Sequence, residues 1–169
     1  MIGSLATPAG SMETVAEAVF PSLSWFQELA RLARVHRSRF EHLGYADCVA
    51  EFCVTDGRPS PFAVQVTFEE FDVTDVRIPS VSDHYRADFR VEGDLATWQR
   101  MLESIARNHG RPDLDQTLNH LTHMGTPMRV TSTDPLRRDL YFRYAQTLQE
   151  FFNLSAAIHT HFAANVGTR

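Results

Sequence analysis

The chain of 169 residues contains no lysine, so all sixteen of its basic residues are arginines. The absence of lysine excludes a Schiff base on a lysine and a phosphate-binding P-loop lysine. No apolar run approaches the roughly 18–20 residues that span a bilayer, so we expect no integral membrane segment. With a formal net charge of −5, the chain has no general basic footprint for nucleic acid, and we expect no nucleic-acid partner.

Cysteine is also scarce, because Cys48 and Cys53 are the only two. Five positions apart on one predicted strand, their side chains point to opposite faces, so we expect two reduced packing residues and no disulfide. The chain lacks a Gly-x-Ser-x-Gly elbow and a dinucleotide-binding glycine pattern, and we expect no cofactor. Residues 1–10 do not read as a signal peptide, and the final Arg169 does not complete a peroxisomal address, which favours a cytoplasmic location.

The most informative segment that is present is a strand followed by a helix. Residues 85–92 alternate between apolar and polar side chains, which predicts a strand with one buried face. Gly93 then allows a sharp turn, and Asp94 can cap the first amides of a helix. The apolar residues of that helix share one face: Leu95, Trp98, Leu102 and Ile105.

The remaining pattern predicts an α+β fold with a five-stranded, mostly antiparallel sheet and helices packed on one face. The other strands are expected at 48–55, 62–69, 73–78 and 128–131. In chain order the first four strands end with 85–92, and the short links between them suggest an antiparallel meander. Helices are expected at 24–43, 94–110, 113–123 and 135–152, the first with a capping box at Ser24–Gln27 and the last with Asp134 as cap and Pro135 at its first position.

We divide the chain into a domain over residues 21–154, an N-terminal arm over residues 1–20 and a C-terminal tail over residues 155–169. The arm contains a short predicted helix near Met12–Val19.

Two segments resemble the sterol carrier protein type-2 family of sterol-binding domains. They are ADFRVEGDLATWQRML at 87–102 and GTPMRVTSTDPLRRDLYFRYAQTLQEFF at 125–152, and the likeness runs from about Leu23 to Leu154. Family members usually have a Gly-Asp pair after the short last strand, where this chain reads Ser-Thr-Asp-Pro at 132–135. The resemblance implies binding or transfer of an apolar small molecule, such as a lipid, a sterol or a similar metabolite, in an internal cavity.

The resemblance also implies which residues line that cavity. They are mostly apolar and aromatic: Phe89, Trp98, Met101, Leu102, Leu118, Met124, Met128, Val130, Tyr141, Tyr144, Leu148 and Phe152. Their helical and strand spacing fits an ordinary packed core equally well. A scaffold or interaction protein would keep this fold and fill the cavity with side chains, and a homodimer is one alternative for the oligomeric state.

An enzyme on the same scaffold is the alternative function: an isomerase, cyclase or lyase that acts on an apolar metabolite by acid–base catalysis without a cofactor. In this hypothesis His120 or His123 is the general acid or base, and Tyr141 or Tyr144 orients a substrate oxygen. Two further polar residues, His84 and Asp139, could reach the same cavity. A buried histidine–carboxylate pair in an apolar pocket would form a tuned proton shuttle.

The eight histidines also raise the question of a metal site. His120 and His123 can share one face of a helix, whereas His159 and His161 share a face only if the chain is extended there. A protein metal site normally has three or four ligands, and no further ligand pattern accompanies either pair. We therefore predict no metal site.

Overall fold

The computed structural model describes residues 14–163, whose main feature is a five-stranded sheet with strand order β4-β3-β2-β5-β6. The strands are β2 (Cys48–Thr55), β3 (Phe62–Glu69), β4 (Asp72–Arg77), β5 (Phe89–Asp94) and β6 (Arg129–Thr131). β5 runs parallel to β2, and the other neighbours are antiparallel. The predicted α+β fold with a mostly antiparallel sheet is confirmed.

The predicted antiparallel meander is wrong, because β5 does not pair with β4. A parallel pair needs a crossover between its strands, and the connection contains the 3-10 helix η1 (Val81–Arg86). The segment at 85–87 therefore belongs to η1 and its end rather than to the strand. Gly93 lies inside β5 and is needed there for close packing, since a Cβ would lie 3.0 Å from Cγ of Met128 and 3.2 Å from Nε1 of Trp98.

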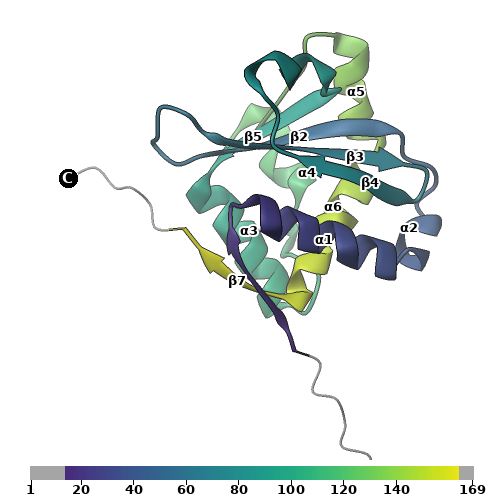
Figure 1. Cartoon of the computed structure of the whole chain (residues 1–169), viewed down its shortest axis with the longest axis vertical. Coiled ribbons are helices and arrows are strands. Elements are labelled where there is room, and N and C mark those ends of the chain that lie inside the picture. The colour runs from purple at the N-terminus through teal and green to yellow at the C-terminus, as the bar shows by residue number, and fades with distance from the viewer. Residues whose placement is uncertain (1–13, 164–169) are drawn as a thin grey trace, which may run out of the picture.

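Helices α1 (Leu23–Val35), α3 (Leu95–Arg107) and α6 (Ala145–Asn153) cover one face of the sheet (Figure 1). Shorter helices α2 (Ser38–Glu41) and α4 (Leu118–Leu121) lie between them in the sequence, together with the 3-10 helices η2 (Leu114–Gln116) and η3 (His123–Gly125). A further 3-10 helix, η4 (Leu154–Ala157), follows α6 directly. Asp94 caps α3 as predicted, with its carboxylate accepting the Thr97 N–H at 2.7 Å. The cap of α1 is Ser22, two residues before the start of the predicted capping box, because its hydroxyl accepts the Trp25 N–H.

The predicted helix 135–152 is divided into α5 (Pro135–Arg143) and α6, which meet at Tyr144. Pro135 is in the first turn and Asp134 accepts the Leu136 N–H, as the sequence predicted. Tyr144 leaves helical geometry with φ −106°. The apolar face therefore changes direction between the two helices. Most of the buried residues of this segment belong to α6, whereas α5 buries only Tyr141.

The core between sheet and helices is a cluster of aromatic rings. Phe52 of β2 lies 4.9 Å from Phe152 of α6 in an edge-to-face arrangement, and Trp98 of α3 lies 5.3 Å from the same ring. The Trp98 indole N–H donates to the Cys53 carbonyl at 3.1 Å, which satisfies its only polar atom. Cys48 and Cys53 are both buried and free, as predicted, with Cys48 on the core side.

A second, two-stranded parallel sheet joins the two ends of the described chain. β1 (Ala16–Phe20) pairs with β7 (Ile158–Phe162) (Figure 1). The Trp25 indole donates to the Thr160 hydroxyl at 3.0 Å. The helix predicted near Met12–Val19 is wrong where it can be compared, because Ala16–Val19 are extended; Met12 and Glu13 lie outside the described residues. Residues 1–13 of the arm and 164–169 of the tail also lie outside them, and the domain boundaries at 21 and 154 remain a prediction.

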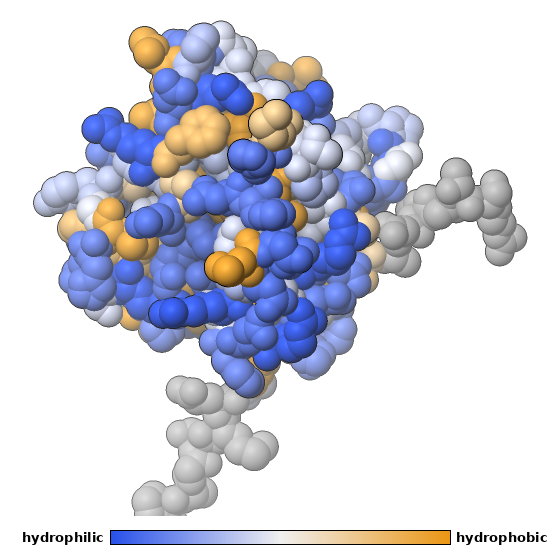
Figure 2. All heavy atoms as spheres, turned by 180° about the vertical axis from the view of Figure 1, so that it is seen from behind, coloured by the Kyte–Doolittle hydropathy of each residue, from blue (hydrophilic) through white to orange (hydrophobic). Residues whose placement is uncertain are grey.

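Figure 2 shows the face opposite to that of Figure 1, where hydrophilic residues predominate and apolar residues occur in small separate groups. Large contiguous apolar patches mark association surfaces, and this face presents none among the described residues. Within residues 14–163, every helix is too short or too polar to cross a bilayer.

Candidate functional site

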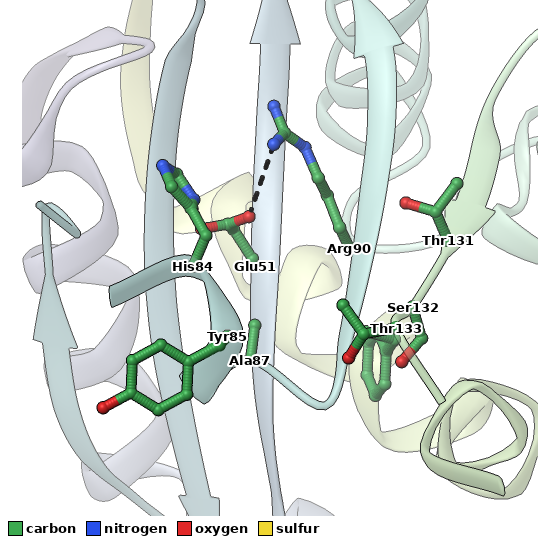
Figure 3. Close-up of a pocket in the computed structure, with 9 residues that line it drawn as sticks. Glu51, His84, Tyr85, Ala87, Arg90, Thr131, Ser132 and Thr133 are labelled. Carbon is green, nitrogen blue, oxygen red and sulfur yellow. Dashed lines mark hydrogen bonds and ion pairs between the residues drawn. The ribbon is translucent and has the colours of Figure 1, made fainter. Parts of the chain in front are cut away.

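An open pocket of about 340 Å³ lies on the face of the sheet that α1, α3 and α6 leave uncovered. It is bounded by η1 on one side and by the connection from β6 to α5 on the other (Figure 3). The lining combines charged, hydroxyl and apolar side chains: Glu51, His84, Tyr85, Ala87, Phe89, Arg90, Thr131, Ser132 and Thr133. Its volume falls at the lower end of the roughly 300–1,000 Å³ typical of small-molecule sites.

A buried carboxylate lies at the centre of the pocket. Glu51 is 1% exposed, and its Oε1 lies 2.6 Å from His84 Nδ1, within hydrogen-bond distance; an imidazole that carries its proton on Nδ1 donates it to this carboxylate. The Gln65 amide donates to the same oxygen at 3.3 Å and to the Asp83 carbonyl at 2.9 Å, so it ties η1 to the sheet. The other oxygen, Oε2, lies 3.6 Å from Arg90 (Figure 3). A charge buried this deeply persists only when it is paired in this way.

Arg90 lies between the Glu51 carboxylate and the thiol of Cys53. The Arg90 guanidinium donates a hydrogen bond to Cys53 Sγ at 2.7 Å. Burial raises the pKa of Cys53 above its ordinary value, against the opposing effect of Arg90, so the thiol stays protonated near neutral pH. The Nε atom of Arg90 is buried and lacks a hydrogen-bond partner within residues 14–163, although Glu92 lies 3.5 Å away. The Arg90 guanidinium therefore lies between two carboxylates, those of Glu51 and Glu92.

The η1 wall of the pocket is held by Arg137 of α5. Its Nε donates to Asp88 at 2.9 Å, and its two terminal nitrogens donate to the carbonyls of Tyr85, Arg86 and Ala87 at 3.2, 3.2 and 2.9 Å. The second carboxylate oxygen of Asp88 accepts the Val49 N–H at 2.7 Å. Only a planar guanidinium with several donors can serve this many oxygens at once.

Most of the residues predicted to line an internal cavity lie in the packed core. They are buried members of one hydrophobic cluster: Phe89, Trp98, Met101, Leu102, Leu118, Met128, Val130, Tyr141, Leu148 and Phe152. Met124 differs, because its side chain is 87% exposed and its backbone is in the left-handed region with φ 60°. Tyr144 is half-buried at the helix break. Phe89 is the member of this set that also lines the open pocket, so contact of the others with a ligand remains a prediction.

The four residues of the acid–base hypothesis do not surround an enclosed space. The side chains of His120 and His123 are exposed. The Tyr141 hydroxyl is buried and donates to the Leu118 carbonyl at 3.3 Å, with Thr122 Oγ1 3.0 Å away. Burial raises the pKa of Tyr141 above its ordinary value. The acid–base roles of His120 and His123 therefore stay a prediction that the exposure of both side chains does not favour.

A histidine–carboxylate pair does occur, but it is formed by His84 with Glu51. His84 is one of the polar candidates predicted from the sequence, whereas Glu51 is not among them. A signal was present: Glu51 interrupts a strand whose other residues from Cys48 to Val54 are apolar, and an isolated carboxylate in such a strand must find a partner. The partner itself is distant in the sequence and could not be read from the pattern.

Comparison with solved structures gives the same fold as sterol carrier proteins. The chain superimposes on the solution structure of a conserved hypothetical protein from Thermus thermophilus, which is described as possibly a sterol carrier protein. The TM-score is 0.58 and the sequence identity is 20%, and the match covers 85% of this chain and 94% of that chain. A crystal structure of sterol carrier protein 2 gives a TM-score of 0.57 and 19% identity, with 79% and 94% covered. No protein-family model matches the sequence, and no curated protein sequence matches it. The likeness therefore confirms the predicted fold, and the function has to be argued from the site.

Proposed function

We propose that this protein binds an apolar small molecule that carries a polar group, such as a lipid, a sterol or a similar metabolite. The observation that carries the proposal is the open pocket, in which apolar side chains lie beside a buried, paired charge on a sterol-carrier-like fold. Tyr85, Ala87 and Phe89 supply apolar surface, and each methylene group that leaves water contributes about 0.8 kcal/mol.

The polar group of the ligand is placed by the other side of the pocket. Arg90 lines the pocket with a partly exposed guanidinium, and His84 is held by Glu51 through Nδ1, which leaves its second ring nitrogen for another partner. The hydroxyls of Thr131, Ser132 and Thr133 lie on the opposite wall (Figure 3). A few placed polar groups beside apolar surface are the usual means by which small-molecule sites fix orientation.

Phe89 connects this pocket with the interior that the sequence predicted as the ligand site. Its ring lines the pocket and also lies 5.6 Å from the ring of Tyr141 in the core. We propose that a ligand longer than the pocket continues past Phe89, and that Met101 and Met128 move to receive it. Methionine suits this role because its side chain is flexible and polarizable.

Native mass spectrometry of the purified protein, followed by titration with a fluorescent fatty acid and a fluorescent sterol, tests the proposal. Thr131→Trp fills the mouth of the pocket and should weaken binding of the probe at least about tenfold, or about 1.4 kcal/mol. Thr74→Trp is the matched control, since Thr74 is an exposed threonine of β4 outside the pocket lining. Absence of copurifying apolar material, together with no binding of either probe, would refute the proposal.

A second candidate function is acid–base chemistry on the bound molecule, which the His84–Glu51 hydrogen bond favours. A carboxylate that orients one ring nitrogen is the usual support of a histidine that transfers protons. Incubation of the protein in D₂O with a ligand identified by mass spectrometry should then introduce deuterium into that ligand. His84→Gln should abolish the exchange and His120→Gln should preserve it; equal exchange with and without protein would exclude this function.

A further inference from the structure

The outer face of the β1–β7 pair brings three metal-binding side chains together. His159 and His161 are two residues apart on an extended strand, so their imidazoles point to the same face. Glu17 lies directly opposite His159 in the parallel register. The sequence made this arrangement conditional on an extended chain, and β7 fulfils that condition.

The ligand atoms of Glu17, His159 and His161 all lie within 4.8 Å of one another. His161 Nε2 is 3.6 Å from the Glu17 carboxylate, and the two imidazole rings are 4.7 Å apart at an interplanar angle of 65°. Around a tetrahedral Zn²⁺ with bonds of about 2.0–2.2 Å, ligand atoms are roughly 3.3–3.6 Å apart. All three side chains are exposed, so small rotamer changes bring the widest pair to that spacing.

We propose that Glu17, His159 and His161 bind a divalent transition-metal ion of the Zn²⁺ type. Two imidazoles and a carboxylate form a donor set that suits Zn²⁺ and its neighbours, whereas Mg²⁺ and Ca²⁺ prefer oxygen ligands alone. Three protein ligands leave at least one coordination position for water or for another molecule.

The register of β7 is fixed independently of any metal. Thr160, between the two histidines, points inward and accepts the indole N–H of Trp25, while Ile158 is buried in the core. The alternation of the strand then forces both imidazoles outward. The site is therefore positioned by the fold and does not depend on the ion to form.

A hollow lies beside one of the three side chains. His159 lines a second hollow of about 460 Å³, together with Val15, Leu102, Glu103 and Phe162. Ser155 also lines this hollow, and its buried hydroxyl lacks a hydrogen-bond partner within residues 14–163. A small ligand that contacts the metal would meet the Glu103 side chain and apolar surface here.

Metal binding also has a structural consequence, because Glu17 and the two histidines belong to strands at opposite ends of the described chain. An ion that binds only when β1 and β7 are paired stabilises the folded state to a degree that grows with its free concentration. Zn²⁺ should therefore raise the thermal unfolding midpoint of the full chain, and a chelator should reverse the rise.

Isothermal titration of the chelator-treated full chain with Zn²⁺ tests the site. We expect one ion per chain, and His159→Gln or His161→Gln should weaken binding at least about tenfold. Glu17→Gln should weaken it as well. The double variant His120→Gln/His123→Gln is the matched control, because it removes two exposed histidines elsewhere and should bind like the unaltered protein.

Circular dichroism of each variant checks that the fold is kept, which the exposure of all three side chains favours. Co²⁺ gives a second readout, since three protein ligands should produce the visible absorption of a low-coordinate ion and the two histidine variants should lose it. Zn²⁺ binding that is weaker than about 1 mM would overturn the proposal. So would binding that survives in the His159→Gln/His161→Gln double variant.

Discussion

Arg137 should be the most sensitive charged residue of the pocket wall. Replacement by glutamine removes the four hydrogen bonds that it donates to Asp88 and to the carbonyls of residues 85–87. Hydrogen bonds that involve a charged group contribute about 1.5–3 kcal/mol each when buried. The side chain is 33% exposed, and its two 3.2 Å bonds are weak, so we expect Arg137→Gln to lower the free energy of unfolding by about 2–3 kcal/mol.

Arg137→Lys tests the contribution of the guanidinium geometry, because it keeps the positive charge and removes the planar group. A lysine ammonium can still pair with Asp88, yet it cannot reach three carbonyls with a planar fork, so we expect a loss of about 1–2 kcal/mol. Both variants should also accelerate amide hydrogen exchange at residues 85–88 and at Val49, whose N–H is held by Asp88. The sterol or fatty-acid probe should bind more weakly, because the wall of its pocket is no longer fixed.

Urea unfolding is the assay, with the midpoint reporting stability and an unchanged slope confirming that the folded state is intact. Arg143→Gln is the control, since Arg143 is an exposed arginine of the same helix, α5, and exposed substitutions stay within about 0.5 kcal/mol. If Arg137→Gln and Arg143→Gln shift the midpoint equally, the hydrogen bonds of Arg137 do not stabilise this wall and the reasoning is refuted.

Three further predictions concern the interior. Trp98→Ala should lower the free energy of unfolding by about 3–5 kcal/mol, because the ring is fully buried and its loss leaves a cavity. Urea unfolding followed by circular dichroism measures this change, and a loss below about 1 kcal/mol would contradict the close packing around the ring. Gly93→Ala should cost about 1–3 kcal/mol in the same assay, because its Cβ would meet Met128 and Trp98 at 3.0 and 3.2 Å; a neutral result would mean that both side chains can shift freely. Burial raises the pKa of Cys48 to about 12, so the native thiol should not react with Ellman's reagent at about pH 8 and should react in urea. Because the pKa of Cys48 is higher in the folded state than in the unfolded state, its contribution to stability is complete below about pH 8.5 and is lost as the pH rises toward 12. Over that pH range the free energy of unfolding of Cys48→Ala should therefore fall less than that of the unaltered protein.

The sequence predicted local structure well where the chemistry is local. Asp94 and Pro135 fix helix starts through interactions with their own neighbours, and the alternation of residues 48–55 and 62–69 depends only on which face is buried. Such features need no knowledge of distant partners. The division at Tyr144 was missed because the apolar spacing continues across it, and the change of direction is imposed by the surfaces on which α5 and α6 pack.

Features that depend on partners far apart in the sequence were not predictable. β5 pairs in parallel with β2, and η1 forms part of the connection that precedes β5. Residues 85–87 continue the apolar–polar alternation of β5 in the sequence, although they belong to the end of η1 and not to the strand. β1 and β7 are only five residues long, and each of them pairs only with the other strand, which lies at the opposite end of the described chain. The same limit applies to the pocket, since Glu51, His84 and Arg90 meet only after these pairings are made.

The interior shows what a hydrophobic pattern can and cannot report. Periodicity predicts which side chains face inward, and nearly all of the proposed lining residues do so. It does not report whether their volumes fill the space between sheet and helices, and around Trp98 the rings of Phe52 and Phe152 occupy that space. A ligand that enters there must displace packed side chains, which costs on the order of the 1–3 kcal/mol of an overpacked core. A chain of several methylene groups offsets this cost at about 0.8 kcal/mol each. Long apolar ligands should therefore reach the interior, whereas short ones should stay in the open pocket beside Glu51 and Arg90.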